Sequence, residues 1–199
     1  MALVIGGKPD SSFDNPLGLL TDCHRRIERF LQQLLLVARE AKGGELSDEQ
    51  RHALEVALRY FREAAPRHTR DEEDSLFPRM RAGGAEETEA ALTALATLEA
   101  DHEAADAAHL QVDEIGRKWL ADGSLAPADH SRLVALLEEL ATLYTAHIKI
   151  EDTQVFPAAE RALPAGEIKA VGREMAERRG IDLSNIPDLK LRCPTRRSI

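Results

Sequence analysis

Histidine and glutamate occur four residues apart at two places in the sequence. Residues 68–78 read HTRDEEDSLFP and residues 147–157 read HIKIEDTQVFP, and the two stretches align without a gap. Each has a histidine, a glutamate four positions later, an acidic residue directly after it, and a Phe-Pro pair. Residues four apart on a helix lie on the same face. Each pair could therefore bind a metal ion through one imidazole and one carboxylate.

A single histidine precedes each pair, at His24 and at His102. The chain thus consists of two similar halves, each with three side chains suited to metal binding. Imidazoles and carboxylates without thiolates suit iron, manganese or zinc. One ion rarely needs six protein ligands as well as an open position, so two bridged ions explain the number better. The alternative is a duplicated helical hairpin that has lost its metal. The candidate ligands are His24, His68, Glu72, His102, His147 and Glu151.

Helices must position these residues. Hydrophobic residues at spacings of three and four predict a first helix between Asn15-Pro16 and Gly43-Gly44. A second helix is expected to begin at a capping box at Ser47 and to be kinked at Pro66. The second helix is expected to end at Phe77-Pro78 and Gly83-Gly84. A third helix is expected over about 86–121 and a fourth over 128–163. A shorter fifth helix over 164–180 precedes an extended tail.

These helices predict an all-α fold, an up-down-up-down four-helix bundle with a short extra C-terminal helix and an extended tail. The composition agrees, because Ala, Leu, Glu and Arg dominate and aromatic residues make up only 4%. We expect residues 1–163 to form the bundle and residues 164–199 to add the helix and tail without forming a separate domain.

The charge balance limits the partners. Acidic side chains number 35 against 26 basic ones, for a net charge of −9. Nucleic acid needs a basic face, so we expect no nucleic-acid partner. The sequence contains no apolar run of about 18 residues and no signal peptide, so we expect a cytoplasmic protein without a membrane partner. Cys23 and Cys193 are too few for a disulfide framework. Nothing in the composition or motifs indicates an oligomeric state.

The order H…HxxxE…H…HxxxE, with Phe-Pro after each pair, resembles the hemerythrin-like (HHE cation-binding) family over about residues 17–160. The resemblance implies a helical bundle around a non-haem di-iron centre, with two iron ions joined by an oxo or hydroxo bridge. It also implies that all six candidates are metal ligands, with Glu72 and Glu151 as the bridging carboxylates.

One position departs from the hemerythrins that carry oxygen, which have a second histidine one turn after the ligand on the third helix. This chain has Asp106 there, four residues after His102. Three interpretations stay open: Asp106 is a ligand, it orients His102 through a hydrogen bond, or it is solvated. Glu28 stands in the same relation to His24 and is a weaker candidate of the same kind.

Other side chains near the ligands have less specific signals. Tyr144 lies three residues before His147 and either donates a hydrogen bond into the site or packs in the core. His109 lies two turns beyond His102, about 10 Å along the helix axis, so we do not expect it to be a ligand. His52 and His130 are expected at the surface, away from the ligands.

Two functions fit this set of residues. The first is a redox enzyme or scavenger that reacts with oxygen, peroxide or nitric oxide, and the second is a sensor or carrier that binds oxygen or iron without turnover. Ferritin-like iron oxidation uses Glu-x-x-His, but Glu49 and His52 lie at the start of the second helix, away from His68. A carboxylate at Asp106 would stabilise ferric iron, so we expect redox chemistry, such as detoxification of peroxide or nitric oxide, rather than carriage.

Overall fold

The computed structural model describes residues 11–83 and 89–183. Their regular secondary structure is helical and no strand occurs among them, which confirms the all-α expectation. Within these ranges, no helix combines the length and the apolar character that a membrane span requires. Most of the tail that we expected after residue 180 lies outside the described residues.

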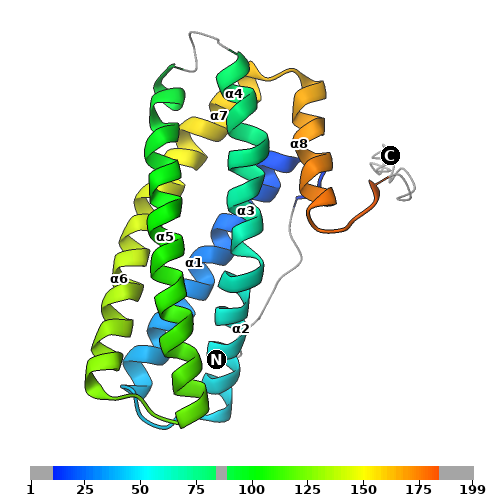
Figure 1. Cartoon of the computed structure of the whole chain (residues 1–199). Coiled ribbons are helices and arrows are strands. Elements are labelled where there is room, and N and C mark those ends of the chain that lie inside the picture. Colours follow the sequence, from blue (N-terminus) through cyan, green and yellow to red (C-terminus); the bar gives the residue numbers. More distant parts are fainter. Residues whose placement is uncertain (1–10, 84–88, 184–199) are drawn as a thin grey trace, which may run out of the picture.

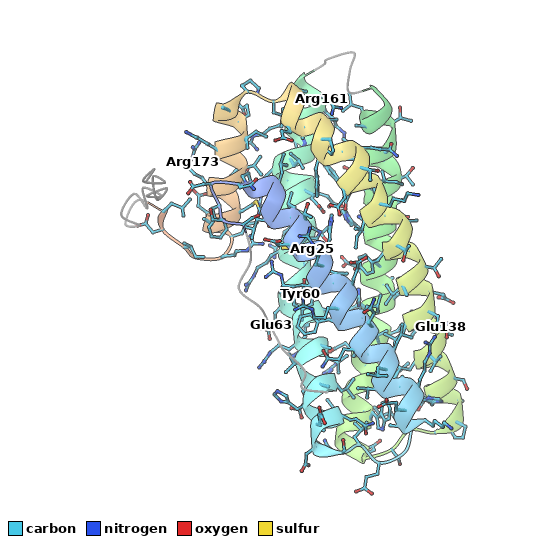
Figure 2. The ribbon with its side chains drawn as sticks, turned by 180° about the vertical axis from the view of Figure 1, so that it is seen from behind. Arg25, Tyr60, Glu63, Glu138, Arg161 and Arg173 are labelled. Atoms are coloured by element: carbon cyan, nitrogen blue, oxygen red, sulfur yellow. The ribbon has the colours of Figure 1, made fainter. Side chains whose placement is uncertain are left out.

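The helices lie side by side, with α1 (Pro16–Ala41) against α2 (Asp48–Glu63) and α6 (Pro127–Ile150), and α5 (Glu89–Asp122) against the same two helices (Figure 1). Figure 2 shows the opposite side, with α1 in front. The elements, in chain order, are α1 (Pro16–Ala41), α2 (Asp48–Glu63), α3 (Ala65–Asp71), η1 (Glu72–Leu76), α4 (Phe77–Gly83), α5 (Glu89–Asp122), α6 (Pro127–Ile150), η3 (Glu151–Val155), α7 (Phe156–Ala162) and α8 (Ala165–Glu177), where η denotes a turn of π-helix.

Local signals set several helix ends as the sequence predicts. The Asn15 side chain caps α1 by accepting a hydrogen bond from the backbone N–H of Gly18. Ser47 and Gln50 form both hydrogen bonds of a capping box at the start of α2. Pro66 falls in the first turn of α3, where its missing N–H is not needed. The expected kink is therefore a break between α2 and α3.

The Phe-Pro pairs do not end helices, contrary to our expectation for Phe77-Pro78. The backbone instead makes a π turn, in which the N–H of Phe77 donates to the carbonyl of Glu72, and then continues into α4. The second copy repeats this turn, with the N–H of Phe156 donating to the carbonyl of Glu151. A proline ring crowds the carbonyl of the preceding helical turn, and we infer that the wider π turn relieves this contact.

In the part of the chain that the structure describes, two buried hydrophobic clusters fill the interior. The larger contains Ile27 and Trp119, and the smaller contains Leu20 and Phe77. Along α1 the smaller cluster ends just before His24 and the larger begins just after it. The candidate ligands therefore form a polar layer between the two clusters.

The short helix α8 contacts α1, α3 and η1 (Figure 1). Asp71, at the end of α3, is completely buried and accepts hydrogen bonds from Arg178 at 2.8 Å and from Arg179 at 2.6 Å. A Cβ atom on Gly172 of α8 would overlap the carbonyl oxygen of Phe13, so the two backbones touch. Because Asp71 directly precedes a candidate ligand, α8 supports the backbone of the site.

We expect the double variant Arg178→Ala/Arg179→Ala to lower the free energy of unfolding by about 3 kcal/mol, because it leaves the buried Asp71 carboxylate without its cationic partners. Arg173→Ala is the matched control, since Arg173 lies on α8 with an exposed side chain (Figure 2). Urea unfolding of the metal-free proteins measures both. Equal stability of the double variant and the control would show that these ion pairs do not hold α8.

Candidate metal centre

All six candidate ligands are buried where α1, α3, α5 and α6 meet the two π turns. Glu151 lies between two histidines, with the same oxygen 3.1 Å from Nε2 of His24 and 3.1 Å from Nε2 of His147. Glu72 instead uses both of its oxygens, because Oε1 lies 3.5 Å from Nε2 of His68 and Oε2 lies 3.5 Å from Nε2 of His102. Each glutamate therefore lies between histidines of both halves of the chain.

Many of these polar atoms have no hydrogen-bond partner among the described residues. Buried polar atoms almost always have a partner, and leaving them without one costs free energy. Their presence in one layer fits a site that binds a cation. The buried atoms without a hydrogen-bond partner at this site include His24 Nε2, His102 Nε2 and both carboxylate oxygens of Glu72 and Glu151.

Within residues 11–83 and 89–183, two groups of side chains are close enough to hold one ion each. The first consists of His24, His68, Glu72 and Glu151, and the second of His102, His147 and Glu151. Within each group, one ligand atom from every residue lies within 4.8 Å of the others. Glu151 belongs to both groups. Imidazole and carboxylate donors without thiolates fit iron, manganese or zinc.

Acidic side chains fix the orientation of three histidines. Glu73 lies 2.8 Å from Nδ1 of His102, and Asp152 lies 3.0 Å from Nδ1 of His24. A carboxylate can only accept, so the imidazole Nδ1–H donates and Nε2 points its lone pair into the site. Each of these acids directly follows a glutamate of the motif and reaches the single histidine of the other half. The acidic residue that directly follows each glutamate of the repeat is the sequence signal for this contact, and its role becomes visible only in the folded chain.

The two halves of the chain differ at the histidine of the His-x-x-x-Glu pair. In the second half, Asp101, which directly precedes His102, lies 3.3 Å from Nδ1 of His147. The corresponding residue in the first half, directly before His24, is Cys23, which is buried. Nδ1 of His68 has no hydrogen-bond partner among the described residues. The imidazole of His68 is therefore less firmly oriented than that of His147.

Burial and mutual charge set the protonation of the glutamates in the metal-free protein. Burial, together with the charge of Glu151, raises the pKa of Glu72 to about 8. Burial acts in the same direction on Glu151, but the imidazoles of His147 and His24, each 3.1 Å from its Oε2, outweigh it and lower the pKa of Glu151 below its usual range. Glu72 thus holds a proton near neutral pH while Glu151 is ionised, and a bound cation would displace that proton.

The histidines also differ in protonation. Burial alone would lower the pKa of His24, but the hydrogen bond with Asp152 and the nearby carboxylates of Glu151 and Glu72 outweigh it and raise that pKa well above its usual value. Burial and the charge of His24 lower the pKa of His68 well below its usual value. The imidazole of His68 is therefore neutral already, as a metal ligand must be, whereas that of His24 would have to release a proton to bind a metal ion.

A cavity of about 10 Å³ lies directly beside the four histidines. This volume admits one water-sized molecule. Its wall on the side of α2 and α5 includes Phe61, Asp106 and His109. The centre thus has space for one small exogenous ligand and little more.

The three weaker candidates lie outside the two groups. Glu28 is exposed, so its carboxylate is solvated. Asp106 is also exposed, although it reaches the wall of the cavity. The hydroxyl of Tyr144 lies 3.0 Å from Nε2 of His109, and both side chains line the cavity. The hydroxyl of Tyr144 therefore hydrogen-bonds to His109 at the edge of the site, and not to a candidate ligand.

The two histidines that we expected at the surface differ from each other. His52 is exposed on α2. His130 is half-buried, and its Nε2 lies 3.0 Å from the carbonyl oxygen of Ala38. His130 therefore joins the start of α6 to the end of α1, which corrects our expectation of a surface position. Neither residue belongs to the two metal-binding groups.

We expect His109 to make the metal-free protein less stable as the pH falls. Burial lowers the pKa of His109 to about 4 from a usual value of 6.5. Between these values the unfolded chain binds a proton that the native state does not, so the free energy of unfolding decreases by about 3 kcal/mol from pH 6.5 to pH 4. His109→Phe should lose less stability over this window, in urea unfolding at several pH values. His52→Ala should follow the parent, and identical slopes in all three proteins would contradict the assignment.

A family model describes most of this chain. The Hemerythrin HHE cation binding domain matches residues 15–159, and the protein belongs to this family. A protein of Haemophilus influenzae described as uncharacterized is 26% identical over 175 residues, which cover 86% of this chain and 94% of that protein. The match confirms the resemblance seen in the sequence motifs and includes all six candidate ligands.

Proposed function

We propose that this protein holds two iron ions bridged by Glu72 and Glu151, and that the loaded centre reacts with oxygen, peroxide or nitric oxide. One observation carries the proposal. Buried imidazole nitrogens and carboxylate oxygens without hydrogen-bond partners converge in two groups that share Glu151. Unpaired polar atoms at such density are costly unless cations bind them.

The two groups suggest how the ligands divide. His24 and His68 would hold one ion, and His102 and His147 the other, with a glutamate oxygen available to each. The pseudo-twofold relation of these groups supports the up-down-up-down bundle that the repeat predicts. Bound iron would supply Lewis acidity and one-electron redox chemistry.

The chain's own residues make that centre selective. Three acids aim the histidine lone pairs at the ions, and the hydrophobic clusters on both sides exclude bulk water. The cavity of about 10 Å³ beside the histidines limits the ligand to a very small molecule. Asp106 stands where oxygen-carrying hemerythrins have a further histidine, and its exposed carboxylate is no substitute for a nitrogen ligand. These features favour redox turnover over reversible carriage.

The test begins with metal analysis of protein loaded anaerobically with ferrous iron, for which we expect two ions per chain. An absorption spectrum after oxidation should show charge-transfer bands in the near ultraviolet. The loaded protein is then mixed separately with oxygen, peroxide and nitric oxide. Turnover supports the redox function, whereas a stable and reversible spectrum supports a sensor or carrier. A single tightly bound ion would refute the two-iron centre.

A further inference from the structure

A second cavity, of about 240 Å³, lies between α2 and α5. Its interior is apolar and includes Leu58, Phe61 and Val112. It opens at the surface, because the rim residue Leu110 is 74% exposed. Arg62 of α2 and Asp113 of α5 also line it and are joined by an ion pair of 2.8 Å.

This outer cavity shares a wall with the cavity beside the four histidines. Phe61, Asp106 and His109 line both, so a single layer of side chains separates the surface opening from the candidate metal centre. The cavities beside Cys23 and beside Thr21 share no lining residue with the inner cavity. Of these three outer cavities, the one between α2 and α5 is therefore the one that adjoins the cavity beside the histidines.

His109 is the polar part of the shared wall. Its ring stacks on Phe61 with centroids 4.1 Å apart, and its Nε2 lies 3.0 Å from the hydroxyl of Tyr144. Its Nδ1 is buried and has no hydrogen-bond partner among the described residues. Either tautomer leaves this nitrogen able to make one more hydrogen bond. A nitrogen without a partner in a wall between two cavities could hydrogen-bond to a small molecule that passes from one cavity to the other.

We propose that small uncharged molecules reach the metal centre through the cavity between α2 and α5, and that His109 is the side chain they meet and displace. This inference rests on the proposed metal centre. The charged residues of the lining are Arg62, Asp106 and Asp113. Their net charge is negative, so the cavity disfavours anions. The apolar interior suits diatomic gases, and Nδ1 of His109 offers a hydrogen bond to a polar molecule such as peroxide.

The test uses nitric oxide and the diferrous protein in stopped-flow experiments. Leu110→Trp places a large ring over the opening without touching the centre, and we expect the association and dissociation rate constants of nitric oxide both to fall about tenfold. Their ratio, the equilibrium affinity, should not change, because a narrowed route slows both directions equally. Leu36→Trp is the matched control, since Leu36 is 51% exposed on α1 and lines none of these cavities. Equal rates in the two variants would overturn the proposal and leave the metal centre standing.

A second variant tests the inner wall. His109→Ala removes the ring that separates the cavities, so the association rate constant of nitric oxide should rise above that of the parent. An unchanged rate would show that His109 does not obstruct the route, which contradicts the proposal.

The metal-free protein gives an independent readout. Apolar cavities bind xenon, and the interior of this one includes Leu58 and Val112. The methyl resonances of Val112 should therefore shift under xenon pressure and should shift less in Leu110→Trp. This result is expected whether or not the protein binds iron. If the parent protein shows no shift at Val112, the cavity does not admit small molecules, and the proposal is wrong even if the metal centre is correct.

Discussion

Glu151→Ala is expected to lose nearly all bound iron, and His68→Ala to retain at most one of the two ions. The difference follows from the geometry, because Glu151 belongs to both metal-binding groups and His68 to one. One carboxylate oxygen of Glu151 lies 3.1 Å from a histidine of each half. The loss of this side chain therefore removes a candidate ligand from both sites. Metal analysis after anaerobic loading with ferrous iron and removal of loosely bound ions measures the occupancy.

The control for these variants is His52→Ala, because His52 is exposed on α2 and lies outside both groups. His130→Ala is less suitable, since the hydrogen bond to the carbonyl oxygen of Ala38 contributes to packing. We expect full occupancy in His52→Ala. Similar losses in His52→Ala and Glu151→Ala would mean that the repeated motif does not bind the metal.

Iron is expected to raise the melting temperature of the protein by roughly 10 °C. Metal that binds only the native state adds about 4 kcal/mol at a thousandfold excess over its Kd, and for a chain of this size each kcal/mol shifts the melting temperature by about 2–4 °C. The physical origin is the polar layer between the two hydrophobic clusters, in which carboxylate and imidazole atoms have no hydrogen-bond partner among the described residues and would gain one in a bound cation.

Calorimetry of metal-free and iron-loaded protein at the same pH measures this shift. Glu151→Ala is the control and should melt at the same temperature with and without iron. The shift should grow as the pH rises towards about 8, because the proton on Glu72 then competes less with the metal. Equal melting temperatures of the loaded and metal-free parent protein would contradict the prediction.

Much of the fold follows from local patterns in the sequence. The helix starts at Asn15 and Ser47 depend on caps formed within a few residues, and the break at Pro66 depends on one missing N–H. The positions of the six candidate ligands were predictable for another reason. Two gapless copies of one motif imply a symmetric arrangement, and that arrangement brings both copies to one layer.

Other features depend on contacts that no local pattern contains. Asp71 looks like a solvated helix charge in the sequence, but it pairs with Arg179, which lies 108 residues later. The wall formed by His109 arises because α5 packs against α2 and α6, which places its ring between Phe61 and Tyr144. The Phe-Pro pairs have the local character of helix ends, yet Phe77 is completely buried and packing carries the helix past it.

The π turns make the length of the metal-binding motif as important as its composition. A π turn holds one residue more than the α turn that it replaces, and successive residues of an α-helix are rotated by about 100°. The extra residue therefore changes the direction of every side chain that follows. α4 and α7 present a different stripe of side chains to the interior than uninterrupted continuations of α3 and α6 would. The loss of one residue between His68 and Phe77 would therefore turn Phe77 and its neighbours out of the core.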